Sequence, residues 1–219
     1  MADAADALHY AHAQRIIHRD IKPGNMILSS DGRIMITDFG LARSGDAESM
    51  TITGAFLGSI RYVSPEQAMA KRLRVDHRTD IYSLGATLYE LLTLEPAFPG
   101  DDEKEILALI MTKDPVHPRK LVPAIPQELE TICLKALEKA VDQRYDTARA
   151  MAEDLRSFLN DMPIAARRPG PVRRVFKFAR RHRAMVTAVT ALVLLTVASF
   201  ISVVAVKKSR ESTLHRLFS

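Results

Sequence analysis

The chain has 219 residues, a formal net charge of +5 and a single cysteine. This length suits one domain with a sizeable core plus appendages, and one cysteine excludes a framework of internal disulfides. The positive charge is concentrated at one end: residues 161–219 carry 12 Lys/Arg and 2 Asp/Glu, a net of +10, whereas residues 1–160 carry 19 Lys/Arg and 24 Asp/Glu, a net of −5. The larger part of the chain is therefore acidic, which argues against nucleic acid as a partner.

The alanine-rich stretch 1–14 predicts the last turns of a helix, and the residues at 15–17 predict a strand after it. His9 and His12 lie three residues apart on this helix, a spacing that can suit a metal ion. No third ligand follows at a sensible distance, so packing at the helix end is the better explanation for both histidines.

One short stretch concentrates polar and charged side chains. The sequence His18-Arg19-Asp20-Ile21-Lys22-Pro23-Gly24-Asn25 places an acid, a base and an amide within six positions, Asp20 to Asn25. Residues 25–28 and 34–36 then predict a short β-hairpin closed by an Asp-Gly turn. The hairpin would bring Asn25 close to Asp38, the first residue of an Asp-Phe-Gly triplet. Their oxygens are ligands that suit Mg²⁺, a hard cation.

Most of the chain between 41 and 160 predicts loops and helices. Residues 41–57 are small and polar, which is typical of a loop. Residues 80–93 are apolar around most of a helical circumference, so they predict a core helix. Helices are also predicted at 103–112, 129–137 and 151–159, with a proline-rich surface connector at 115–126. The helix at 129–137 would bury Cys133 as a packed core thiol. The resulting fold class is mainly α with a short β-hairpin.

The composition changes near residue 161. Residues 161–183 form a basic linker, and residues 184–206 then run for 23 positions without a charge. At 1.5 Å per residue a helix of this length spans about 34 Å, enough to cross a hydrocarbon core of about 30 Å. Eight Lys/Arg lie in 167–183 against four in the short tail 207–219. The positive-inside rule therefore predicts a single-pass membrane protein whose residues 1–160 lie in the cytoplasm.

The pattern H-R-D-x-x-x-x-N at 18–25, followed by D-F-G at 38–40, resembles the catalytic loop and the magnesium-binding motif of the protein kinase superfamily. Within it, Lys22 and the run Gly58-Ser59-Ile60-Arg61-Tyr62-Val63-Ser64-Pro65-Glu66-Gln67-Ala68 are similar to bacterial eukaryotic-like serine/threonine kinases. The resemblance covers residues 1 to about 160 and implies a protein-kinase-like C-terminal lobe.

This resemblance implies transfer of the γ-phosphate of ATP to Ser/Thr hydroxyls of protein substrates, with Mg²⁺ as the metal. Asp20 would be the catalytic base and Lys22 the contact to the γ-phosphate. Asn25 and Asp38 would bind the metal, and Ile27 would form part of the floor beneath the adenine.

The resemblance also implies supporting roles near the site. Ser59, which stands where the family usually has threonine, would bridge Asp20 and Lys22. Asp80 would hold the backbone of the catalytic loop from the start of the central helix.

Two further roles concern charge. Arg144 would pair with Glu66, although on the sequence alone these are two charges far apart. Arg19 is typical of a catalytic loop that is switched on by phosphorylation, and a phosphate on Thr51 or Thr53 would pair with it.

Only 17 residues precede His18, and the sequence has no G-x-G-x-x-G and no strand of the Val-Ala-Ile-Lys type. We therefore expect a kinase domain without its N-terminal lobe. Two functions are consistent with this expectation: a membrane-anchored signalling kinase, or a catalytically inactive lobe that serves as a membrane-tethered docking module. An in-frame glycine-rich loop and strand lysine upstream of Met1 would favour the first. By resemblance, the chain would also form homodimers.

Overall fold

The computed structural model describes residues 1–39, 56–69 and 75–166. The chain divides into two compact units, Met1–Arg167 and Arg168–Ser219, and all the described residues belong to the first. Thr51, Thr53, the predicted span 184–206 and the tail 207–219 therefore lie outside the described residues, as does the linker from residue 167 onward. No helix among the described residues is long and apolar enough to cross a membrane.

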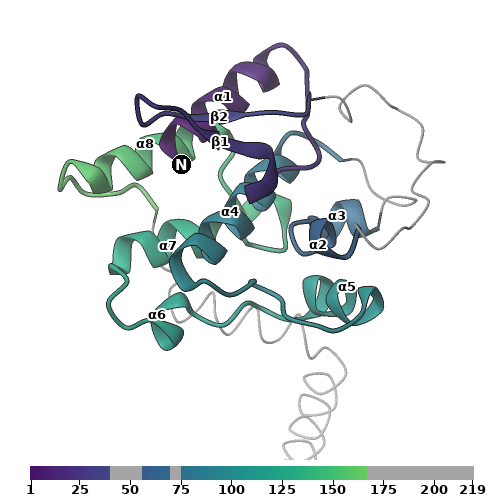
Figure 1. The fold of residues 1–219 in the computed structure, drawn as a ribbon. Helices are drawn as coiled ribbons and strands as arrows, with labels where there is room; N and C mark the ends of the chain where they lie inside the picture. Colours follow the sequence, from purple (N-terminus) through teal and green to yellow (C-terminus); the bar gives the residue numbers. More distant parts are fainter. Residues whose placement is uncertain (40–55, 70–74, 167–219) are drawn as a thin grey trace, which may run out of the picture. The chain divides into compact units, whose positions relative to one another are not determined.

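The described part is mostly helical, with one two-stranded antiparallel sheet, which confirms the prediction of a mainly α fold with a short β-hairpin (Figure 1). Its elements, in chain order, are α1 (Ala2–Ala13), the 3-10 turn η1 (Pro23–Asn25), β1 (Met26–Leu28), β2 (Ile34–Ile36), α2 (Phe56–Ile60), α3 (Pro65–Ala68), α4 (Arg78–Thr93), α5 (Glu103–Thr112), α6 (Pro118–Leu121), α7 (Gln127–Ala136), the 3-10 turn η3 (Val141–Gln143) and α8 (Ala148–Leu159).

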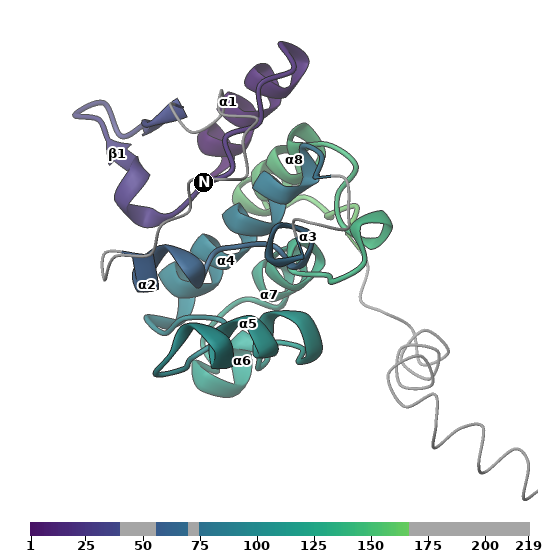
Figure 2. The same cartoon turned by 90° about the vertical axis from the view of Figure 1, so that its right-hand side faces the viewer.

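Helix α4 passes between the other elements, with α1 and the hairpin on one side and α5 and α6 on the other (Figures 1 and 2). Residues 79–89 of this helix are all buried, as the apolar circumference predicted. Gly85 makes the close approach to α7 possible, because a Cβ atom added there would lie 2.6 Å from the Cβ of Ala136. The helix ends at Thr93, and Leu94 then adopts a left-handed conformation with φ 58°.

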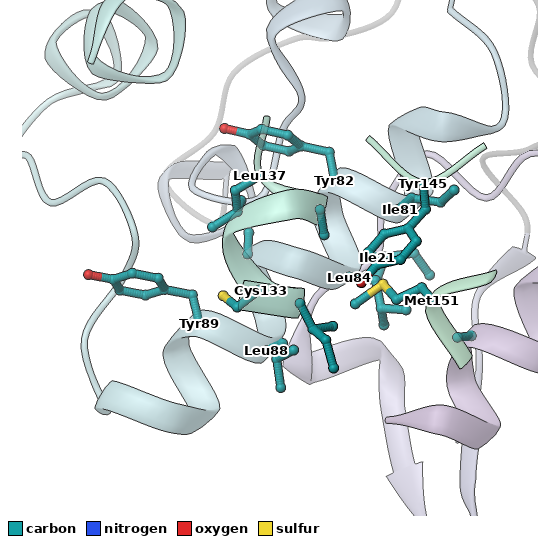
Figure 3. Close-up of a cluster of buried hydrophobic side chains, with 14 of the residues drawn as sticks. Ile21, Ile81, Tyr82, Leu84, Leu88, Tyr89, Cys133, Leu137, Tyr145 and Met151 are labelled. Carbon is teal, nitrogen blue, oxygen red and sulfur yellow. The ribbon is translucent and has the colours of Figure 1, made fainter. Parts of the chain in front are cut away.

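The core is built where α4, α7 and α8 meet, and Figure 3 shows Leu84, Leu88, Cys133 and Met151 within it. The Cys133 thiol is fully buried and donates to the carbonyl of Gly85 at 3.6 Å. Burial raises the pKa of this thiol, so it stays protonated. The predicted packed core thiol is confirmed.

The hairpin pairs Met26 with Ile36 and Leu28 with Ile34, and Gly32 supplies the positive φ of 82° that its turn requires. One end of this prediction needs correction. Asn25 ends the 3-10 turn that precedes the strand, so β1 begins one residue later than the predicted stretch 25–28.

The predicted strand at 15–17 is wrong. Arg15 adopts a left-handed conformation with φ 61°, and the N–H of Ile16 donates back to the carbonyl of Ala11 at 3.0 Å. This bond closes the C-terminus of α1, so the chain turns there instead of pairing with another strand.

The region 115–126 is more structured than a surface connector. It contains α6, and Pro118 and Ile125 are both buried. Helix α5, in contrast, has the bounds that the sequence predicted, and the side chain of Asp102 caps it by accepting from the N–H of Glu105 at 2.8 Å.

Candidate active site

The side chains of Asp20, Lys22, Asn25 and Ser59 form one hydrogen-bonded cluster, in which Lys22 and Asn25 both bind the carboxylate of Asp20. The Nζ of Lys22 lies 2.8 Å from Asp20 Oδ2 and 2.7 Å from Ser59 Oγ. The Nδ2 of Asn25 donates to the same Oδ2 at 3.0 Å and to the carbonyl of Asp20 at 2.7 Å. The lysine and aspartate side chains keep 25% and 19% of their surface exposed. The cluster is therefore ordered by internal bonds yet open to solvent.

Asp38 is held next to this cluster by the hairpin. The N–H of Thr37 donates to the carbonyl of Asn25 at 2.9 Å. Asp38 is the next residue after Thr37, so this bond keeps its backbone close to Asn25. Asp38 has a φ of 61°, a left-handed conformation that is uncommon outside glycine. The amide and carboxylate oxygens of Asn25 and Asp38 are the donor types that Mg²⁺ prefers, so these residues fit that metal chemically.

His18 contacts the residues on both sides of Asp38. One ring nitrogen of His18 shares a hydrogen bond with the carbonyl of Thr37 at 2.8 Å. The ring of Phe39 packs edge-on against the ring of His18, with their centroids 4.7 Å apart. The segment 37–39 is thus tied to the loop 18–25 at both Asn25 and His18.

Asp80, at the start of α4, holds the backbone of this loop. It is fully buried, and its two oxygens accept from the N–H of His18 at 2.8 Å and of Arg19 at 2.7 Å. Arg19 has a φ of 68°, so Asp80 stabilises a residue in a strained conformation. The ring of His12 adds a third bond to the carboxylate at 2.8 Å. His12 was predicted only to pack at the helix end, and its bond to Asp80 was not predicted.

Glu66 and Arg144 form a buried bidentate ion pair. The two guanidinium nitrogens of Arg144 lie 2.6 and 2.7 Å from the two carboxylate oxygens of Glu66, and the side chains are 0% and 4% exposed. Arg144 also donates to the backbone carbonyls of Glu138, Lys139 and Arg78. The pair fixes α3 against the chain that precedes α8.

The segment between α2 and α3 is also tied to α4. The Oη of Tyr62 donates to a carboxylate oxygen of Glu90 at 2.6 Å, and the Oγ of Ser83 donates to the carbonyl of Tyr62 at 2.7 Å. Burial, together with the bond to Glu90, raises the pKa of Tyr62 far above its usual value. This phenol therefore remains a neutral donor at physiological pH.

Ile27 lies on β1 opposite Met35, and the two side chains are 48% and 51% exposed. The neighbouring Leu28 is 72% exposed. The hairpin thus presents apolar side chains to solvent next to Asn25, which ends the 3-10 turn before β1.

A family model for the protein kinase domain matches residues 1–156. The chain belongs to the protein kinase family. The serine/threonine-protein kinase PknB of Mycobacterium leprae is 43% identical over 156 residues, which cover 71% of this chain and 25% of that protein. A probable serine/threonine-protein kinase of Streptomyces coelicolor, SCO3848, is 43% identical over 162 residues, covering 73% and 24%.

A probable serine/threonine-protein kinase PknB of Bifidobacterium longum is 40% identical over 169 residues, covering 76% of this chain and 24% of that protein. This kinase chain therefore spans about a quarter of the length of the curated relatives that it matches.

Among the residues predicted for the kinase site, the structure brings Asp20, Lys22, Asn25 and Ser59 into one bonded cluster and ties Asp38 to it through the hairpin backbone. It also brings Glu66 to Arg144 and Asp80 to the backbone of Arg19. The contact of Gln67, whose Nε2 donates to the carbonyl of Arg19 at 2.9 Å, was not predicted. The pattern Ser-x-x-Gln at 64–67 matches a capping box, which predicts a helix start but no contact with the catalytic loop.

Proposed function

We propose that residues 1–160 form the C-terminal lobe of a serine/threonine protein kinase that transfers the γ-phosphate of ATP to a hydroxyl of a protein substrate. The observation that carries this proposal is the cluster around Asp20, in which Lys22 and Asn25 both bind Oδ2. These bonds hold the carboxylate in one orientation, as a base that must meet a substrate hydroxyl requires. A lysine two residues after the aspartate favours serine and threonine over tyrosine as substrates, by resemblance.

Each side chain has a task in this mechanism. Asp20 accepts the proton of the substrate hydroxyl or orients that hydroxyl for in-line attack. Lys22, held between Asp20 and Ser59, offers positive charge to the transferring phosphoryl group. Asn25 and Asp38 would hold Mg²⁺, which when bound with ATP neutralises charge on the phosphates, and Ile27 would lie beneath the adenine.

The experiment that tests this proposal compares phosphate transfer from ATP by the purified wild-type protein and by Asp20→Asn, with a Ser/Thr protein acceptor. We expect the rate to fall by about 10²–10⁴-fold, the usual contribution of a general base. The matched control is Asp31→Asn, the same chemical change at an exposed residue of the hairpin turn, which should keep wild-type activity.

Equal phosphate transfer by the wild type and by Asp20→Asn would contradict the proposed kinase activity. It would favour the alternative, a catalytically inactive docking module. In that case the chain should still bind protein partners with the Asp20 cluster altered, because docking does not depend on proton transfer.

We propose in addition that residues 184–206 anchor the protein in a membrane as a single span, with residues 1–160 in the cytoplasm. This rests on the 23 uncharged positions and on the excess of Lys/Arg in 167–183 over 207–219. Homodimer formation stays a prediction, which sedimentation of the purified protein at several concentrations would test.

A further inference from the structure

The side chain of Gln67 connects three segments that are distant in the sequence. Its Nε2 donates to the carbonyl of Arg19 at 2.9 Å. Its Oε1 accepts from the N–H of Ser64 at 3.1 Å and from the hydroxyl of Thr79 at 2.7 Å. The Oγ of Ser64 adds a bond to the same Oε1 at 3.2 Å. The amide therefore lies between the catalytic loop, the start of α3 and the start of α4.

The orientation of this amide is fixed by its partners. The carbonyl of Arg19 can only accept and the N–H of Ser64 can only donate, so nitrogen must face Arg19 and oxygen must face Ser64. Ser64 and Thr79 are fully buried. The neighbouring residue Glu66 is locked by Arg144, which holds α3 in place. Gln67 is thus presented to the catalytic loop from a rigid support.

The bond to Arg19 falls at the most strained point of the loop. Arg19 has a φ of 68°, and its own N–H is held by Asp80 at 2.7 Å. Its carbonyl belongs to the peptide that joins it to Asp20, and the N–H of that peptide donates to His18 Nδ1 at 3.3 Å. Asp80 therefore fixes one side of Arg19, while Gln67 and His18 fix the peptide on its other side.

We propose that Gln67 is a positioning residue for catalysis, whose amide holds the Arg19–Asp20 peptide in the conformation that aims the Asp20 carboxylate. This inference rests on the proposed function, because it assigns Gln67 a role in the same reaction. Gln67 acts through the backbone that carries Asp20. To bind the carbonyl of Arg19 and the N–H of Ser64 together, a side chain must have the length of glutamine and carry both a donor and an acceptor at its end.

Gln67→Glu isolates the donor, because it keeps the shape of the side chain and the bonds that Oε1 accepts from Ser64 and Thr79, while it places a carboxylate oxygen against the carbonyl of Arg19. We expect kcat to fall by about tenfold or more while the KM for ATP stays close to the wild-type value, since a lost bond of this kind costs about that factor. Gln127→Glu is the matched control at an exposed position at the start of α7, and it should keep wild-type kinetics.

A pH profile separates positioning from mere structural support. When the introduced carboxyl of Gln67→Glu is protonated, its O–H can donate to Arg19 again. The ratio of variant to wild-type kcat should therefore rise as the pH is lowered from 7 to 5, toward the ordinary glutamate pKa of about 4.3. A constant ratio, with kcat lowered at every pH, would contradict the proposal and leave Gln67 as a structural residue only.

Ser64→Ala tests the simpler explanation that Gln67 only caps α3. This variant removes the hydroxyl of the capping box but leaves the bond from Gln67 to Arg19. It should lower the Tm while kcat stays within about twofold of the wild type, because the cap contributes to helix stability. If Ser64→Ala and Gln67→Glu lower kcat equally, the proposal is wrong.

Amide hydrogen exchange provides a readout that needs no kinase activity. The N–H groups of Arg19 and Asp20 should exchange about tenfold faster in Gln67→Glu than in the wild type and in Ser64→Ala. If the wild type transfers no phosphate but this difference is seen, the proposed function fails and the positioning of the loop by Gln67 stands. Equal exchange in all three proteins overturns the positioning role, whatever the activity.

Discussion

At the scale of single residues, the Glu66–Arg144 pair illustrates how much one buried charge depends on another. Both side chains are almost completely buried, and two short bonds join them. The pair itself adds little net free energy, because burying two charges offsets their attraction. Removing one partner is different, since the other charge then remains buried without compensation.

Arg144→Ala should therefore lower the free energy of unfolding by about 3–5 kcal/mol. The measurement is urea denaturation of the wild type and the variant. Arg149→Ala serves as the control, because Arg149 pairs with Glu153 at 3.5 Å on the surface, where both side chains are about two-thirds exposed. That change should stay within about 0.5 kcal/mol of the wild type. Similar losses for both variants would contradict the assignment.

Single residues also show what a sequence can reveal about this site. Asp20, Lys22 and Asn25 could be predicted because their roles depend on local spacing within one loop. Glu66 and Arg144 are 78 positions apart, so no local pattern joins them, and only the family resemblance suggested the pair. The contacts of His12 with Asp80 and of Gln67 with Arg19 span 68 and 48 positions. They arise from the packing of helices whose arrangement was not predicted.

At the scale of elements, helices with a clear apolar pattern were predicted well, and short connecting segments were not. Helix α4 is recognisable because apolar residues surround it, and α5 because Asp102 precedes an amphipathic run. The strand predicted at 15–17 fails because its β-branched residues follow a helix whose end is closed by a turn at Arg15. Local propensity for a strand is overridden there by the hydrogen bonds of the helix terminus.

The contact between α4 and α7 gives a prediction at this scale. Gly85→Ala should lower the free energy of unfolding by about 1–3 kcal/mol, because the added Cβ would lie 2.6 Å from the Cβ of Ala136 and 3.3 Å from its carbonyl carbon. This loss outweighs the gain in helix propensity, which is at most about 1 kcal/mol. Urea denaturation monitored by circular dichroism measures the change.

Gly58 in α2 offers the matched control for this substitution. A Cβ added there would meet nothing within 4 Å, so Gly58→Ala should be neutral or slightly stabilising. In the double variant Gly85→Ala with Ala136→Gly, the clash is removed, so the two substitutions should destabilise by less than the sum of their separate effects. If the two losses of stability simply add, the Cβ of Ala136 is not what makes an alanine at position 85 unfavourable.

At the scale of the whole molecule, the charge of the chain is divided between its parts. Residues 1–160 are acidic, whereas residues 161–219 carry the excess of Lys/Arg on both sides of an uncharged run. A soluble tail would gain nothing from 23 successive uncharged positions, but a helix that crosses a bilayer requires them. This distribution supports our proposal of a membrane anchor, in which the basic linker would meet anionic lipid.

This proposal predicts that the wild-type protein stays in the membrane fraction after extraction with alkaline carbonate. Leu194→Arg combined with Leu195→Arg should release it, because each charge at the centre of a span costs roughly 2.5–3.5 kcal/mol on insertion. Lys207→Arg with Lys208→Arg keeps the flanking charge and should leave the protein in the membrane.

Protease added to inverted vesicles, but not to intact spheroplasts, should digest residues 1–160. Release of the wild type by carbonate would contradict the span, and digestion in intact spheroplasts would reverse its orientation.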